Sequence, residues 1–105
     1  MPAGVMLVFS APASDEVRTE YDDWYDNTHI PEMRKAAPAI TDVQRYVLKG
    51  PVPPALEGRD RLAIYTVEDV AAAQSGIAAA ASGLTRSDTL QRDPPVLVIF
   101  YDEPA

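Results

Sequence analysis

The chain has 105 residues, which is the size of one domain with a single hydrophobic core. Its 16 acidic and 9 basic side chains give a formal net charge of -7, which disfavours nucleic acids and anionic membranes as partners. Cysteine is absent, which excludes disulfides and thiolate metal sites and is compatible with a cytoplasmic protein.

The first half of the chain predicts a strand, a helix and a second strand. Gly4–Ser10 is a continuous apolar run that is too short for a buried helix, so it indicates a strand. A helical pattern follows, with Ser14 as the expected N-cap. Pro31 lacks an N–H and restricts the residue before it, so we expect a break near residues 29–30 and a short second helix that starts at Pro31. Residues 42–49 alternate in direction as the second strand.

The second half predicts a strand, a helix and a last strand. Residues 50–58 hold three Pro and two Gly and indicate a stiff loop. Arg61–Val67 and residues 96–101 are apolar strands, and residues 68–82 form an Ala-rich helix with one apolar stripe. The order β-α-β-β-α-β predicts one α+β domain over residues 1–105. Its fold is ferredoxin-like, with an antiparallel four-stranded sheet and two main helices on one face.

The strands also predict a partner. Two helices can cover only one face of the sheet, yet the first, third and fourth strands are apolar on both faces. A second copy of the chain, packed sheet to sheet, is the simplest cover. We therefore expect a homodimer through the open sheet face. The apolar runs are all much shorter than a membrane span, so no membrane association is expected.

Polar and aromatic side chains concentrate in residues 21–34, which hold the only Trp, the only His, two of the five Tyr and four of the sixteen acidic residues. His29 is the one side chain whose ordinary pKa suits proton exchange near neutral pH. Tyr25, Asp26 and Glu32 lie three or four positions away and are candidates to assist or orient its ring. Alternatively, His29 only caps the helix end or bonds a carbonyl group there.

Four further side chains are candidates for binding a substrate. Trp24 can stack on a planar molecule, but its helical phase with Tyr21 favours a place in the core. Tyr46 and Tyr65 lie on strands, where they either line a barrel interior or pack as ordinary cross-strand neighbours. Arg45 alternates with valines and needs an anion, and we favour an acidic residue of the fold over a substrate carboxylate.

Other chemistries have little support. Asp22, Asp23 and Asp26 are more typical of a solvated helix face than of a metal site, since no second His accompanies them. The chain has no glycine-rich phosphate loop, no dinucleotide fingerprint and no serine nucleophile motif. We expect neither a metal nor a cofactor.

The run WYDNTHIPEM at residues 24–33, followed by QRYVL at 44–48, resembles the EthD-like branch of the dimeric α/β-barrel superfamily. Members of that branch carry Trp-Tyr and then His-hydrophobic-Pro-Glu between the first two strands. The resemblance implies a dimeric barrel over the whole chain but selects no reaction. The superfamily includes cofactor-free monooxygenases, polyketide cyclases, muconolactone isomerases, haem-degrading enzymes and chlorite dismutases. Its haem-binding members usually place the axial ligand elsewhere, so we do not expect His29 to bind haem.

These observations lead to three hypotheses. In the first, the protein is a cofactor-independent isomerase, cyclase, lyase or monooxygenase that acts on a small, mainly apolar metabolite of aromatic, phenolic or lactone-like type. His29 is its general acid or base, oriented by Asp26 or Glu32 and assisted by Tyr25. In the second, the protein is a non-catalytic dimer that binds a hydrophobic metabolite. In the third, it is a structural dimer without a pocket.

Overall fold

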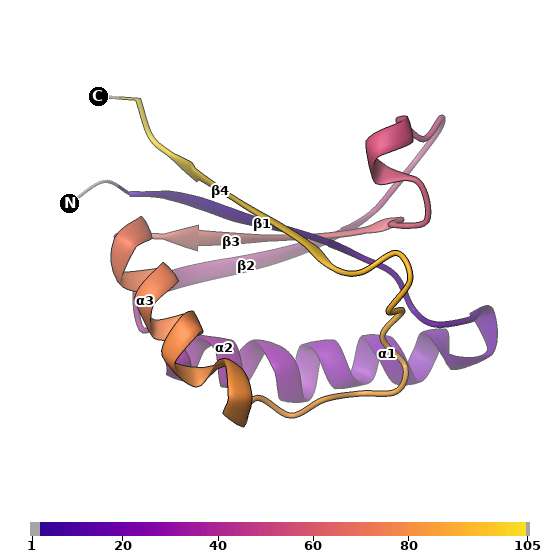
Figure 1. Cartoon of the computed structure of the whole chain (residues 1–105), viewed down its shortest axis with the longest axis horizontal. Helices are drawn as coiled ribbons and strands as arrows, with labels where there is room; N and C mark the ends of the chain where they lie inside the picture. Colours follow the sequence, from indigo (N-terminus) through magenta and orange to yellow (C-terminus); the bar gives the residue numbers. More distant parts are fainter. Residues whose placement is uncertain (1–2, 105) are drawn as a thin grey trace.

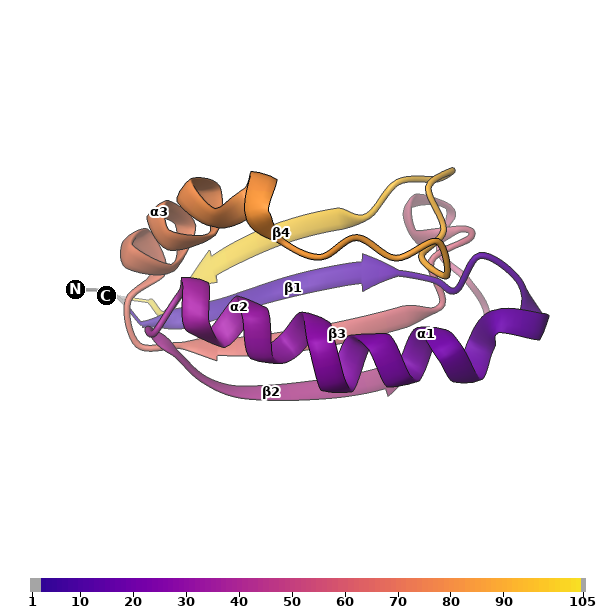
Figure 2. The same cartoon turned by 90° about the horizontal axis from the view of Figure 1, so that it is seen from below.

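A four-stranded sheet carries the α-helices on one face (Figures 1 and 2). The computed structural model describes residues 3–104. Its main elements are β1 (Gly4–Ser10), α1 (Arg18–Trp24), α2 (Ile30–Ala36), β2 (Ile40–Val47), β3 (Arg61–Val67), α3 (Val70–Ala80) and β4 (Leu97–Asp102). The strand order is β2-β3-β1-β4, and every neighbouring pair is antiparallel. This is the predicted ferredoxin-like arrangement.

Alternation along the central strands builds the core. Every second residue of β1 and β3 is buried against the helices. Met6 pairs with Tyr65 and Val8 with Ala63 across the two strands, so these side chains lie side by side on the inner face. Tyr21 from α1 is fully buried against them. Burying a large apolar side chain contributes roughly 1.5–3 kcal/mol, so this inner face fixes the position of the helical layer.

The opposite face of the sheet, here called the open face, is also apolar. Side chains of the alternate parity point to it from all four strands. They include Val5, Leu7, Phe9, Tyr46, Leu62, Ile64, Leu97, Ile99 and Tyr101. Tyr46 and Tyr101 are about half exposed. Within residues 3–104 no α-helix lies on this face, and only the short turn η3 (Pro54–Leu56) stands at one end of it (Figure 1).

The predicted helix break before Pro31 is wrong. The chain stays helical from Arg18 to Ala36, because a π turn, η2 (Tyr25–His29), joins α1 to α2. The Ile30 N–H donates to the carbonyl oxygen of Tyr25, five residues earlier. A π turn carries one extra residue, which shifts the carbonyl groups that the ring of Pro31 would meet in a regular α-helix. The helix therefore absorbs the proline instead of ending there.

Smaller differences concern element ends. β2 runs over Ile40–Val47 instead of residues 42–49, with an irregular register between Ile40 and Asp42. α3 begins at Val70, because the Asp69 carboxylate accepts from the Ala72 N–H at 3.1 Å and caps the helix. In the part of the chain that the structure describes, no helix is long and apolar enough to span a bilayer.

An ion-pair cluster fastens α1 to the sheet. The Asp22 carboxylate accepts from Arg45 at 2.8 Å and from Arg61 at 2.7 Å, and Asp26 accepts from Arg45 at 3.0 Å. The Arg45 guanidinium also lies 4.5 Å from the centre of the Tyr25 ring. The preference for an acidic partner of Arg45 within the fold is thus confirmed. The acidic helix face is solvent-accessible as predicted, since Asp23 and Asp26 are exposed and Asp22 is partly exposed. What the sequence did not predict is that Asp22 and Asp26 also pair across to the strands.

We predict that Asp22→Asn lowers the free energy of unfolding by about 1–2 kcal/mol at pH 7, because it removes the charge facing a largely buried Arg61. Burial alone would raise the pKa of Asp22, but hydrogen bonds and charges of Arg45 and Arg61 outweigh it and lower that pKa. Its contribution is therefore present above the unfolded pKa of about 4 and disappears as the pH falls through the lower folded value.

Urea denaturation at pH 7 and at acidic pH measures this difference. Asp23→Asn is the matched control, because Asp23 is exposed on the same helix, and we expect a change within about 0.5 kcal/mol. Equal stability of the two variants at pH 7 would show that the cluster does not hold the helix.

Candidate functional site

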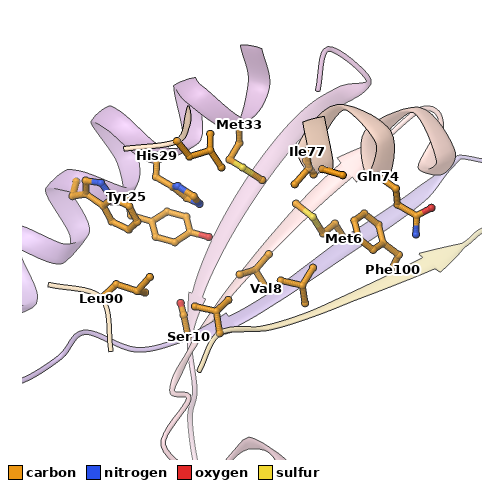
Figure 3. Close-up of a pocket in the computed structure, with 15 residues that line it drawn as sticks. Met6, Val8, Ser10, Tyr25, His29, Met33, Gln74, Ile77, Leu90 and Phe100 are labelled. Carbon is orange, nitrogen blue, oxygen red and sulfur yellow. The ribbon is translucent and has the colours of Figure 1, made fainter. Parts of the chain in front are cut away.

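A cavity of about 320 Å³ lies between the helical layer and the sheet (Figure 3). Its floor comes from β1 and β4, and its roof from η2, α2 and α3. Most of the side chains that line it are apolar, and they include Met6, Val8, Met33, Ile77, Val98 and Phe100. This volume is at the lower end for sites of small organic molecules. The cavity is therefore suited to a compact, mainly apolar ligand.

The π turn decides which side chains reach the cavity. In a regular α-helix, residues five positions apart point about 140° away from each other. Here Trp24 and His29 are five apart, yet their rings stack with centres 4.8 Å apart and planes inclined by 25°. Tyr25 packs edge-on against His29 with ring centres 4.9 Å apart. All three rings line the cavity, because the extra residue of the turn brings position 29 back over position 24.

His29 is mostly buried in this aromatic setting. Burial lowers the pKa of His29, and the nearby charge of Glu32 opposes that shift only in part. The imidazole is therefore neutral at pH 7 and keeps one ring nitrogen free to accept a proton. Among the described residues, none is hydrogen bonded to this ring, so aromatic packing holds its position.

The two carboxylates expected to orient His29 are engaged elsewhere. Asp26 pairs with Arg45. Glu32 accepts from the N–H of Thr85 at 2.8 Å and from its hydroxyl at 2.6 Å. Those hydrogen bonds lower the pKa of Glu32. Neither acid therefore donates to or accepts from the His29 ring, and Glu32 instead binds Thr85.

Glu32 holds the segment of residues 84–96, here called the strap. Leu84, Leu90 and Val96 of the strap line the cavity, so this segment forms one of its walls. The Glu32–Thr85 contact fastens one end of the strap to α2. Near the other end, the Gln91 N–H donates to the carbonyl oxygen of Ala11 at 2.9 Å.

Two pairs of hydroxyl groups stand at the cavity wall. The Tyr25 hydroxyl lies 3.0 Å from that of Tyr65, and the Ser10 hydroxyl lies 2.6 Å from that of Tyr21. Ser10 and Tyr25 line the cavity, whereas Tyr65 and Tyr21 lie behind them and are fully buried. Burial raises the pKa of Tyr25, and it raises that of Tyr65 to about 12. These tyrosines are therefore protonated at neutral pH.

Three of the predicted residues, Tyr46, Arg45 and Tyr65, do not line the cavity. Tyr46 lies on the open face and is 50% exposed, because it pairs with Leu62 there while its neighbour Arg45 points inward. Arg45 belongs to the ion-pair cluster and does not line the cavity. The Tyr65 hydroxyl is hydrogen bonded to that of Tyr25. Trp24, which the sequence placed in the core, is only partly buried and reaches the cavity.

Sequence reasoning missed two polar groups of the cavity, Ser10 and Gln74. Ser10 shares its parity along β1 with Met6 and Val8, so the inward direction of its side chain was predictable. Its hydrogen bond to Tyr21 was not, because that contact depends on how the helix sits on the sheet. Among residues 3–104, no cluster of three metal-ligating side chains is present.

Comparisons with known proteins identify the fold. No family profile matches the chain, and no curated protein matches it in sequence. A solved structure does match: an ethyl tert-butyl ether D (EthD) family protein from Bacillus halodurans C-125, with a TM-score of 0.57 and 17% identity. The alignment covers 99% of this chain and 100% of that one. The chain has an EthD-like fold. At this identity the EthD likeness concerns the fold alone, and the site must be argued from its own residues.

We predict that the pKa of His29 lies below 6.5, since burial disfavours the imidazolium. NMR titration of the single His gives this value without ambiguity. Glu32→Gln should lower it further, because the Glu32 charge is what raises it. A folded pKa below the unfolded one also means that wild-type stability falls as the pH drops below about 6.5, relative to His29→Gln. A pKa at or above 6.5 would show that the ring is solvated.

Proposed function

We propose that this protein is an enzyme in which neutral His29 removes a proton from a small, mainly apolar carbonyl or phenolic compound. The observation that carries the proposal is the position of His29: a partly desolvated imidazole in the wall of an apolar cavity, between two aromatic rings. A neutral imidazole is the side chain best matched to proton transfer near pH 7. The EthD-like fold, which houses small-molecule chemistry in other proteins, is compatible with this role.

The cavity residues have separate roles in substrate binding and in proton transfer. The apolar body of the substrate packs against Met6, Val8 and Phe100, while Trp24 in the cavity wall supports a planar ring. His29 accepts the proton, and Tyr25 donates a hydrogen bond to the substrate oxygen. An imidazolium is costly in this apolar setting, so the proton returns to the substrate at another position or leaves with a product. Isomerisation, cyclisation and elimination all follow this pattern.

The same proton abstraction can lead to oxygenation. A substrate carbanion carries the electrons that dioxygen needs, so a monooxygenase would use the same residues. The missing orienting carboxylate favours a second candidate, a non-catalytic module that binds a hydrophobic metabolite. In that case His29 contributes one polar contact and no proton transfer, and binding does not depend on its protonation.

We further propose that the functional unit is a homodimer in which a second copy covers the open face. The support is the row of apolar side chains there, which includes Leu7, Ile64 and Ile99 at the centre of the sheet. A contiguous apolar face of this kind is rare on a monomer. Sheet-to-sheet packing about a two-fold axis would bury it in both copies.

The catalytic proposal is tested with phenols, quinones, lactones and cyclic ketones, screened first by thermal shift and then for conversion. We predict that His29→Gln keeps the fold and the thermal shifts but lowers turnover of the converted compounds by about 10²–10⁴-fold. Asp23→Asn is the control for substitution elsewhere on the helix. Unchanged turnover in His29→Gln would remove the acid–base role and favour the binding module.

The dimer is tested by sedimentation velocity. We predict a species of twice the 11.4 kDa chain mass and its loss in Leu7→Lys, which places a charge at the centre of the open face. Ala72→Lys is the control, because Ala72 is exposed on α3. A folded wild-type monomer at micromolar concentration would contradict the dimer, whatever the outcome for His29.

A further inference from the structure

The polar groups of the cavity wall include two hydroxyl pairs of the same design. In each pair the front residue lines the cavity, Ser10 in one case and Tyr25 in the other. A fully buried tyrosine stands behind each of them, Tyr21 behind Ser10 and Tyr65 behind Tyr25. The front residues are themselves only 4% and 2% exposed. Figure 3 shows Ser10 and Tyr25 toward the same side of the cavity as His29.

The number of protons in each pair determines which hydroxyl group donates the hydrogen bond. Two hydroxyl groups hold two protons, and their mutual hydrogen bond uses one of them. If the front hydroxyl donated, the proton of the buried tyrosine would need a second acceptor. Among the described residues, neither Tyr21 nor Tyr65 has a second acceptor, since the Arg45 guanidinium next to the Tyr21 oxygen can only donate. Leaving a buried donor unpaired costs about 1–3 kcal/mol, so the buried tyrosine donates and the front hydroxyl keeps its proton for the cavity.

We infer that Ser10 and Tyr25 act together as hydrogen-bond donors to the oxygen of a carbonyl substrate, with Tyr21 and Tyr65 as the residues that position them. This deepens the proposed function and rests on it for the chemistry: the occupant is an apolar ketone, quinone or lactone. A hydrocarbon would leave both donors unpaired, and an ammonium group offers no acceptor.

The two donors also complete the proton transfer. When His29 takes the proton on the carbon next to the carbonyl, the C–H electron pair forms a C=C bond. The carbonyl π pair moves to the oxygen, which becomes an enolate. Hydrogen bonds from Ser10 and Tyr25 then face the atom on which negative charge develops. Return of the proton from His29 to a different carbon of a conjugated enolate completes an isomerisation, with no co-reactant required.

Binding of 1-tetralone and of its hydrocarbon analogue tetralin tests the inference by NMR titration. The two molecules share one carbon skeleton and differ in the carbonyl oxygen. We expect wild-type protein to bind 1-tetralone about 10-fold or more tightly than tetralin. That preference should fall about 3–10-fold in Ser10→Ala and in Tyr25→Phe, which corresponds to one hydrogen bond each.

Further variants separate a loss of stability from a loss of the preference for 1-tetralone. Ser10→Ala leaves the buried Tyr21 hydroxyl without an acceptor and is expected to lower the melting temperature. The double variant Ser10→Ala/Tyr21→Phe removes both hydroxyls and should restore much of that stability while retaining the loss of preference. The His29→Gln variant should keep the preference for 1-tetralone, which separates this inference from the catalytic proposal. Equal affinity for the two molecules, no binding of 1-tetralone, or a preference unaffected by Ser10→Ala/Tyr21→Phe would overturn the inference.

Discussion

One backbone hydrogen bond governs the site: the bond from the Ile30 N–H to the Tyr25 carbonyl oxygen, which closes the π turn. Without the extra residue of that turn, Trp24 and His29 would point to different sides of the helix. With it, both rings stack in the cavity wall, beside Tyr25. Irregular turns of this kind cost stability and recur at functional sites, and here the turn also accommodates Pro31. The same π turn therefore accommodates Pro31 in the helix and places the aromatic rings in the cavity wall.

The cavity is supported from behind by polar contacts that do not reach it. Asp22 joins Arg45 and Arg61, and the Arg45 guanidinium covers the ring of Tyr25. That ring in turn packs against His29, and its hydroxyl contacts Tyr65. Within residues 3–104 the imidazole has no carboxylate partner, but it is held by a chain of packed and charged groups that ends in the sheet. This is a rigid support for a ring in an apolar environment.

Element order, strands and helices were largely predictable, because burial imposes a period of two on β1 and β3 and a helical period on α3. The concentration of His29, Trp24 and Tyr25 in one segment also located the site. The π turn was not predictable from Pro31, since a proline permits either a break or a bulge and the packing decides between them. The roles of Glu32 and Ser10 depend on Thr85 and Tyr21, which are distant in sequence. Such contacts arise only when the helical layer meets the sheet.

The central claim is that His29 removes a proton from carbon in an apolar cavity. Its most direct test is deuterium incorporation, which detects the abstraction even when the final product is unknown. Cyclic ketones and lactones are incubated in D₂O with wild-type protein or His29→Gln, and the loss of the signal of the C–H next to the carbonyl is followed by proton NMR. We predict exchange with at least one compound, slowed about 100-fold or more in His29→Gln. Exchange at the same rate in both proteins, or none above the buffer background, would contradict it.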